Sequence, residues 1–317
     1  MNESDAPTSL AARLHSLGVT VFERGWLSSN NVLIQGSEST TLVDSGYYTH
    51  ASQTLSLIQS ALKGRGLDML LNTHLHSDHC GGNAALQTAF PNLKTLIPPG
   101  QAESVAAWDP VALTYEPTGQ GCPAFGFQGV LEPGTSMMLG EAFWEVHAAK
   151  GHDPHSIVLF EPLQKVLISA DALWENGFGI VFPELEGAEA FDDVANTLTL
   201  IESLAPKIIV PGHGAVFEDV DGALQRARGR LEQFVKDPDK HRRHALKVLI
   251  KFKLLEWQRA SKPQMLDWYV KTPYLASIER RSPTSDLEIL RHSLDSLIQD
   301  LARSNALRTE GDFLFNV

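Results

Sequence analysis

In the first two thirds of the chain, hydrophobic residues recur with either the period of a strand or the period of a helix. This pattern predicts alternating strands and helices. Short runs rich in branched residues, at 19–22 and 31–34, are typical of strands. A polar turn leads from the second run into another apolar run at 41–46, and this pair predicts an opening hairpin. Apolar residues between 54 and 62 recur at helical spacing and predict a helix that ends at Gly64.

The same two periods continue as far as residue 210, with one long interruption. Residues 98–140 contain repeated Gly and Pro with scattered aromatic residues, and they follow neither period. Such a connection is often a binding loop or lid, so Trp108 and Tyr115 are candidates for a substrate pocket. The alternative is that these aromatic side chains only pin the loop to the surface. Strands are expected at 94–97, 143–147, 157–160, 166–169 and 207–210, and helices at 9–17, 82–90 and 190–204.

The pattern becomes helical beyond Gln225. Helices are expected at 245–257, 263–270 and 286–304, followed by a small hairpin at 307–315. A capping box at 285–288 marks the start of the last helix. That helix carries one apolar stripe, which we interpret as a face that packs on the first part of the chain and covers its pocket. The stripe consists of Leu287, Leu290, Leu294, Leu297, Ile298 and Leu301.

Charge divides the chain at the same place. Residues 1–224 hold 8 Lys and Arg against 26 Asp and Glu, a net charge of −18, whereas residues 225–317 hold 18 against 12, a net charge of +6. We therefore predict a catalytic domain over 1–224 and an extension over 225–317. The acidic part argues against general affinity for nucleic acid, and the basic extension keeps that possibility open.

Length and composition suit an ordinary globular protein. The 317 residues allow one large or two ordinary domains, and 43% are hydrophobic and 20% charged. No apolar run is long enough for a membrane span, and the polar, acidic start does not resemble a signal peptide. We therefore expect a cytoplasmic protein without membrane partners. Cys80 and Cys122 are the only cysteines, and a structural disulfide between them is not expected.

Candidate chemistry is concentrated in residues 73–82, which read THLHSDHCGG. If residues 70–76 are extended, His74 and His76 project from one face and Leu75 points into the core. Asp78 and His79 would follow in a loop. Imidazole nitrogen and carboxylate oxygen suit zinc, iron or manganese. So dense a group of ligands favours a metal site over a solvated polar loop.

This stretch resembles the H-x-H-x-D-H signature of the metallo-β-lactamase fold superfamily. Three further pieces follow in the order of that family, namely Gly151-His152, Ser169-Ala170-Asp171 and Pro211-Gly212-His213-Gly214. The resemblance implies an αββα sandwich with all ligands at one rim. It implies one metal ion at His74, His76 and His152, another at Asp78, His79 and His213, and a bridging carboxylate at Asp171.

The resemblance also implies the chemistry. Two divalent ions, with zinc favoured over iron or manganese, would hold a bridging hydroxide as the nucleophile, and Asp78 would orient the water or accept its proton. Metallo-β-lactamases proper carry Cys or Ser where this chain has Asp171, whereas thioesterases of the glyoxalase II type, lactonases and nucleases keep the aspartate. We therefore predict a hydrolase of a small acyl substrate, a thioester, ester or lactone.

Several alternatives stay open. A metal-dependent endoribonuclease or phosphodiesterase that uses the basic extension is the second candidate, and a non-hydrolytic iron protein is the third. The helices and hairpin of the extension resemble the winged-helix module of some metallo-β-lactamase-fold hydrolases. A homodimer is also open. His155 and Trp174 are further pocket candidates, and Asp44 either lies near the metals, as an acid does in the family, or caps a turn.

Overall fold

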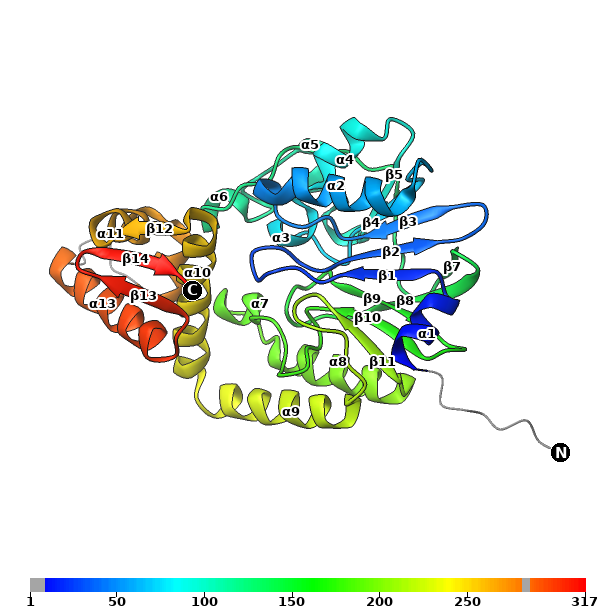
Figure 1. The fold of residues 1–317 in the computed structure, drawn as a ribbon. Helices are drawn as coiled ribbons and strands as arrows, with labels where there is room; N and C mark the ends of the chain where they lie inside the picture. The colour runs from blue at the N-terminus through cyan, green and yellow to red at the C-terminus, as the bar shows by residue number, and fades with distance from the viewer. Residues whose placement is uncertain (1–8, 281–285) are drawn as a thin grey trace.

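The computed structural model describes residues 9–280 and 286–317, which form a layered body and a smaller lobe beside it (Figure 1). Two sheets face each other in the body. The first has the order β1-β2-β3-β4-β5-β6 and the second the order β11-β10-β9-β8-β7. The first comprises β1 (Val19–Phe22), β2 (Asn31–Gln35), β3 (Thr40–Val43), β4 (Met69–Leu71), β5 (Lys94–Ile97) and β6 (Gly129–Val130). The second comprises β7 (Ser136–Leu139), β8 (Ala142–Ala148), β9 (Ile157–Glu161), β10 (Val166–Ala170) and β11 (Ile208–Pro211).

The space between the sheets is filled by apolar side chains from both. Ile34 and Val43 of the first sheet pack with Trp144, Leu159 and Ile168 of the second. Strands β3, β9 and β10 are buried along their whole length, which explains their unbroken apolar runs. The strand pairs also confirm the predicted hairpin, since β2 and β3 are antiparallel.

Helices cover the outer face of each sheet, so the body is the expected αββα sandwich. Ile58 and Leu62 of α2 pack with Leu86 of α4 on the first sheet. Val194 and Leu198 of α8 cover the second sheet together with α9. The helices of the body are α1 (Leu10–Ser16), α2 (Ala51–Leu62), α3 (Ser77–Cys80), α4 (Asn83–Ala89), α5 (Ala102–Ala107), α6 (Tyr115–Thr118), α7 (Phe182–Leu185), α8 (Phe191–Leu204) and α9 (Val220–Lys236), with single 3-10 turns at Tyr48–His50 and Pro99–Gln101.

The segment 98–140 is more regular than its sequence indicated. It contains α5 and α6, and its last part forms β7, which pairs with β8 in antiparallel register. The pattern hides β7 because its side chains are mostly exposed or half-buried, as befits a strand at the edge of the sheet.

The lobe is formed by the C-terminal part of the chain and has the element order of a winged helix. A helix, a strand, three helices and a hairpin follow one another, and the strands form a sheet of order β12-β14-β13. Its elements are α10 (Pro238–Trp257), β12 (Arg259–Ser261), α11 (Lys262–Lys271), α12 (Pro273–Ile278), α13 (Leu287–Arg303), β13 (Leu307–Glu310) and β14 (Phe313–Asn316).

The apolar stripe of α13 builds this lobe rather than docking it. Leu294, Leu297 and Ile298 are buried against Ile250 of α10 and Met265 of α11, so the interpretation of the stripe as a face that packs on the catalytic part is wrong. Leu287 is half exposed. Asp286 caps the helix by accepting a hydrogen bond from the Glu288 amide, and Ser285 of the expected capping box lies outside the described residues.

The predicted boundary after residue 224 falls inside α9. The buried side chains of this helix, from Val220 to Phe234, belong to the core that covers the second sheet. The core of the lobe begins with Leu246 on α10. By packing, the chain therefore passes from one unit to the other at Asp237, where α9 ends and α10 begins. Among the described residues, no helix has both the length and the apolar character that a membrane span needs.

His241, at the start of α10, makes stability depend on pH. Its Nε2 accepts a hydrogen bond of 3.2 Å from the Val181 amide, and its ring packs against Phe191 and Phe234. Burial lowers its pKa to about 4. The unfolded chain therefore binds a proton that the folded chain does not, and stability is lost as the pH falls from the usual pKa of 6.5 to 4, by about 3 kcal/mol.

His241→Gln, which keeps an acceptor for Val181, should remove this part of the pH dependence. Urea unfolding at several pH values between 7 and 4 gives the free energy of unfolding for both proteins. Parallel curves for the wild type and the variant would contradict the assignment.

Candidate metal centre

Four loops at one rim of the sandwich carry the predicted ligands. Each of them begins where a strand of the core ends, and this places their side chains together although they are far apart in sequence. The segment with His74, His76, Asp78 and His79 follows β4, His152 follows β8, Asp171 follows β10, and His213 follows β11.

The histidine-rich segment is not extended as expected. Strand β4 ends at Leu71, residues 72–76 are irregular, and α3 begins at Ser77. The last ladder contact is made by the Asn72 amide, which donates to the Leu96 carbonyl, and the next amide, that of Thr73, donates to Asp44 Oδ1 at 2.9 Å. His74 and His76 still meet, with ring centroids 4.6 Å apart.

The two glycines after this segment are needed for close packing. Both have helical backbone angles, with φ of −61° at Gly81 and −83° at Gly82. A Cβ atom at Gly81 would lie 2.6 Å from the Tyr48 amide nitrogen, and one at Gly82 would lie 2.5 Å from the Ser45 carbonyl oxygen. Any larger residue would therefore push the segment away from the loop that carries Asp44.

All seven predicted ligands meet at the rim. They form three groups in which every ligand atom lies within 4.8 Å of the others. Asp171 and His79 link the groups, because Asp171 Oδ1 lies 3.4 Å from His79 Nε2 and Asp171 Oδ2 lies 3.4 Å from His152 Nε2. The groups are His74, His76 and His152; His74, His79 and Asp171; and Asp78, His79 and His213.

The unpaired nitrogens of the cluster fit metal ions. His74 Nε2 and His79 Nε2 are buried and have no hydrogen-bond partner, which is costly unless a cation takes the lone pair. In addition, His76 Nδ1 and His152 Nε2 face each other at 2.8 Å. Two aromatic nitrogens converging in this way, beside ionised carboxylates, form the donor set that a divalent cation requires.

Residues behind the cluster fix the orientation of its members. His152 Nδ1 lies 2.6 Å from the Ile180 carbonyl oxygen, so it must be protonated, and this leaves Nε2 free as a ligand. Asp44 Oδ2 lies 2.8 Å from His79 Nδ1 and fixes that ring in the same way. Of the two readings of Asp44, the structure supports the one that places it beside the metal site.

Protonation states follow from burial and from neighbouring charges. Burial lowers the pKa of His74 well below its usual 6.5 and that of His152 to about 4, so both rings are neutral. Burial also opposes the charge on Asp171, but the imidazoles of His79 and His213 outweigh it and lower the pKa of this carboxyl well below 3.8. Burial opposes the charge on His79 too, yet three carboxylates, led by that of Asp171, raise its pKa well above 6.5. The carboxylates thus attract a cationic charge at this position.

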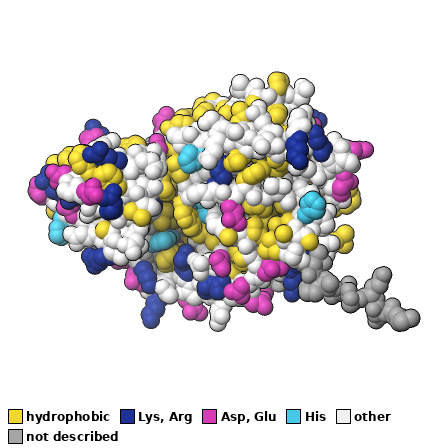
Figure 2. All heavy atoms as spheres, viewed as in Figure 1, with side chains coloured by type: hydrophobic (Ala, Val, Ile, Leu, Met, Phe, Trp, Pro, Cys, Tyr) yellow, Lys and Arg dark blue, Asp and Glu magenta, His cyan; other side chains and the backbone are white. Residues whose placement is uncertain are grey.

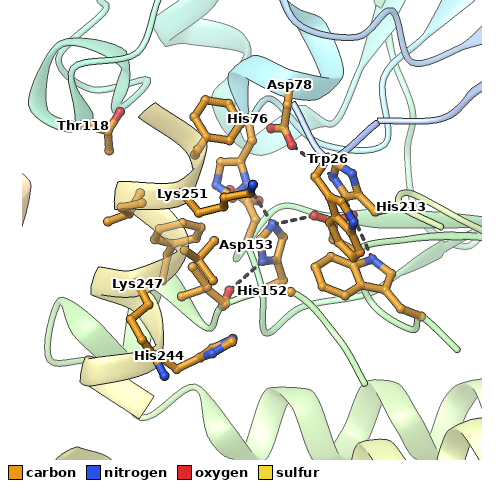
Figure 3. Close-up of a pocket in the computed structure, with 18 of the residues that line it drawn as sticks. Trp26, His76, Asp78, Thr118, His152, Asp153, His213, His244, Lys247 and Lys251 are labelled. Carbon is orange, nitrogen blue, oxygen red and sulfur yellow. Dashed lines mark hydrogen bonds and ion pairs between the residues drawn. The ribbon is translucent and has the colours of Figure 1, made fainter. Parts of the chain in front are cut away.

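A cavity of about 820 Å³ opens between the rim and the lobe. Figure 2 shows the corresponding hollow, in which hydrophobic and histidine side chains gather. In Figure 3, Lys247 and Lys251 of α10 lie across the cavity from His76, His152 and Asp78. The lobe thus forms one wall of the cavity, as the sequence predicted, although α10 supplies most of that wall and Leu301 is the one residue of the predicted stripe on α13 that lines it.

Two of the four pocket candidates line this cavity, and two do not. His155 and Trp174 are in its wall, and Trp174 donates to Asp171 Oδ1 at 3.2 Å. The expectation for Trp108 and Tyr115 is wrong, because both pack into a separate core under the segment 98–140. Tyr115 is pulled inward by its hydroxyl, which donates to the Leu75 carbonyl at 2.9 Å. That segment still reaches the cavity through Ala112, Thr114, Thr118 and Gln120.

Trp26 is a pocket residue that sequence reasoning missed. It lies in the loop between β1 and β2, is 55% exposed, and stacks on His213 with the rings 5.3 Å apart and 9° from parallel. Its ring also contacts Trp174 edge to face. A single tryptophan in a loop gives no periodic signal, so only the fold shows that it borders the metal ligands.

Comparisons with known proteins agree with this geometry. Residues 24–213 match the sequence model of the metallo-beta-lactamase superfamily. A hydroxyacylglutathione hydrolase of Brucella anthropi is 27% identical over 162 residues, a match that spans half of this chain and half of that enzyme. The protein YobT of Bacillus subtilis is 24% identical over 220 residues, covering 63% of this chain and 90% of YobT.

Solved structures show how far the likeness extends. A metallo-beta-lactamase family protein of Thermus thermophilus, TTHA1429, superposes with a TM-score of 0.53 at 18% identity and covers 95% of this chain and 99% of its own. A beta-lactamase domain protein of Burkholderia ambifaria superposes with a TM-score of 0.52 at 18% identity and covers 94% of this chain and 91% of its own. TTHA1623 in a di-iron-bound form superposes with a TM-score of 0.53 at 25% identity and covers 66% of this chain and 98% of its own. The first two likenesses cover nearly the whole chain and therefore include the lobe.

Proposed function

The chain belongs to the metallo-β-lactamase superfamily, and on that premise we propose that it is a dinuclear metal-dependent hydrolase of a small acyl substrate. The observation that carries this proposal is the position of Asp171, whose two oxygens each lie 3.4 Å from a histidine of a different ligand group. A carboxylate placed in this way can join two ions, which one imidazole nitrogen cannot do. Zinc is our expectation, and iron and manganese suit the same donors.

Each ion would have its own residues. We assign the first to His74, His76 and His152 and the second to Asp78, His79 and His213, with Asp171 between them. A pair of divalent ions, when bound, supplies a hydroxide nucleophile at neutral pH and polarises the substrate carbonyl. Asp78 lines the cavity, and its Oδ2 lies 3.1 Å from His213 Nε2. It is our candidate for the group that orients the water and accepts its proton.

The rim also offers a surface for the acyl group. Trp26, Trp174 and Phe182 border the cavity beside the ligands and give it an apolar wall that can exclude water from the reacting carbon. Hydrolysis then breaks the bond between the acyl carbon and sulfur or oxygen, forms a bond to the water oxygen, and leaves a carboxylate and a protonated thiol or alcohol. Such leaving groups need less protonation than an amine, which favours thioesters, esters and lactones over amides.

The positions of five basic residues bear on the nuclease alternative. Arg242 is paired with Asp239, Arg243 with Asp300, and the buried Lys253 with Glu256. Lys247 and Lys251 alone among the five line the cavity. Moreover α13, which corresponds to the DNA-reading helix of winged-helix proteins, holds two arginines against three acidic residues. Three of the five basic residues are therefore already paired with carboxylates, and α13 offers a polynucleotide no excess of positive charge.

We expect the metal-replete protein to hydrolyse an activated thioester or lactone and to cleave structured RNA weakly or not at all. The catalytic part carries −18 and repels a polyanion, so hydrolysis of a neutral acyl substrate should change little with salt. A panel of thioesters, lactones, a β-lactam and a structured RNA measures this directly. Efficient, salt-sensitive RNA cleavage that is lost in Asp78→Ala, together with inertness toward every acyl substrate, would reverse the proposal.

A further inference from the structure

A second cavity of about 660 Å³ lies between α9 and α10 and adjoins the catalytic cavity. The two cavities share four lining residues, Asn176, Arg230, His244 and Lys247. The two cavities therefore lie side by side, separated by these shared side chains. Figure 3 labels two of the shared residues, His244 and Lys247.

The second cavity is lined by cations. Arg226 and Arg230 lie one turn apart on α9, and Lys240, Arg243 and Lys247 follow one another at spacings of three and four on α10. Residues at these spacings lie on one face of a helix. With Lys251 in the first cavity, the stripe on α10 covers the 12 residues from 240 to 251, or about 16 Å.

Carboxylates neutralise only part of this charge. Within the described part of the chain, Asp300 is the one acidic residue in the wall of the second cavity, and it pairs with Arg243 at 2.9 Å and lies 3.9 Å from Lys247. Arg226 pairs with Asp219 outside the cavity wall. Arg230 has no carboxylate partner among the residues that the structure describes and makes only a long hydrogen bond of 3.5 Å to the Phe178 carbonyl.

Arg230 is partly buried and lacks a carboxylate partner among the described residues, and this combination favours a bound anion. Its guanidinium lies over Gly177, where a Cβ atom would come within 2.6 Å of it, so the site has room for this side chain only because residue 177 is glycine. A half-buried guanidinium without an anion is costly. An anionic group of a ligand would offset that cost.

We propose that the second cavity binds the phosphate groups of the thiol portion of the substrate, so that the substrate is an acyl thioester of a phosphorylated thiol such as coenzyme A. This rests on the proposed function, since the acyl end must reach the metal ligands. Five cations against one carboxylate suit a multiply charged group better than a single carboxylate, and guanidinium groups bind phosphate in a bidentate manner. The cavity is bounded by α9, α10 and Asp300, which suits a small ligand rather than an extended polynucleotide.

Desulfo-coenzyme A, which lacks the thiol that would bind metal ions, is the probe for this site. Isothermal titration calorimetry of the metal-replete protein should give a dissociation constant that rises with ionic strength. Arg230→Gln and Lys247→Gln should each weaken binding about 10-fold, as expected for a charge-assisted hydrogen bond. Lys271→Gln, which removes an exposed lysine of α11 outside both cavities, is the matched control and should leave it unchanged.

A variant that should bind the probe more tightly excludes misfolding as the cause of weaker binding in the other variants. Asp300→Asn removes the acidic residue of the cavity and frees Arg243 and Lys247, so it should bind desulfo-coenzyme A more tightly than the wild type. Weaker binding by this variant, or unchanged binding in both Arg230→Gln and Lys247→Gln, would overturn the proposal.

Turnover separates this proposal from the proposed function. Lys240→Gln, at a residue that lines the second cavity alone, should raise the KM for a coenzyme A thioester about 10-fold and leave hydrolysis of the matching N-acetylcysteamine thioester within about twofold. If both thioesters are hydrolysed and the substitution changes their kinetics equally, the phosphate site is wrong and the proposed hydrolase function is retained. Binding of desulfo-coenzyme A without turnover of any acyl substrate would instead support the phosphate site and contradict the proposed hydrolase function. If the substitution raised the KM for a glutathione thioester equally, or if structured RNA displaced the probe, the cavity would belong to another ligand.

Discussion

Replacement of Asp171 by alanine should lower kcat/KM for acyl hydrolysis by about three orders of magnitude or more, while the protein stays folded. Each oxygen of this carboxylate faces a histidine of a different ligand group, at 3.4 Å. No other side chain in the three groups offers two donor atoms to two neighbouring groups in this way. The side chain lies at the rim and contributes nothing to the apolar cores, so its removal should not unfold the chain.

Asp153→Ala is the matched control for this variant. Asp153 is a buried carboxylate at the same rim, with Oδ2 3.7 Å from His76 Nε2, yet it belongs to none of the ligand groups. Its removal should cost far less activity. Steady-state kinetics, with circular dichroism to check the fold, compares the two proteins. Comparable activity in Asp171→Ala and Asp153→Ala would show that the second ion has been placed wrongly.

Asp44→Asn should weaken metal binding about 10-fold to 100-fold, although Asp44 is not itself a ligand. Its Oδ2 lies 2.8 Å from His79 Nδ1 and accepts the Thr73 hydroxyl at 2.8 Å, and Oδ1 accepts the Thr73 amide. The carboxylate thus orients His79 and holds the start of the ligand segment. An asparagine can keep one of these contacts but loses the charge that makes His79 a better donor.

Competition with a chromophoric chelator measures this loss directly, without depending on any substrate. Asp68→Asn is the control, because Asp68 accepts from Thr40 at the start of β3 and β4, whereas Asp44 and the ligand segment follow the ends of these strands. It should alter the free energy of unfolding and leave metal affinity unchanged. Equal metal affinity in Asp44→Asn and the wild type would mean that Asp44 serves only the backbone turn, in which its φ is +57°.

The ligands could be predicted from sequence because each motif is local. His74, His76, Asp78 and His79 fall within six residues, and the later histidines and aspartate follow apolar runs that proved to be strands. The resemblance to the metallo-β-lactamase family implied the αββα layers, and the apolar runs fit them, since a strand that is buried on both faces has no polar alternation. The winged-helix order of the lobe was visible in its helices and hairpin.

Side-chain contacts over long distances decided what the sequence could not show. The strand expected over 70–76 ends at Leu71 because the Asp44 side chain captures the Thr73 amide, and no period contains that information. Tyr115 is drawn inward by a single hydrogen bond to Leu75. The stripe of α13 has the spacing of a docking face, but only the fold shows that its partners lie within the lobe.

The most direct test of the central claim is the number of metal ions that one chain holds. Seven side chains in three linked groups exceed what a single ion can use. Elemental analysis of metal-replete protein, followed by calorimetric titration of the metal-free form, should give close to two divalent ions per chain in wild type and close to one in His213→Ala. A single tightly bound ion in the wild type, with no second binding event on titration, would contradict the account.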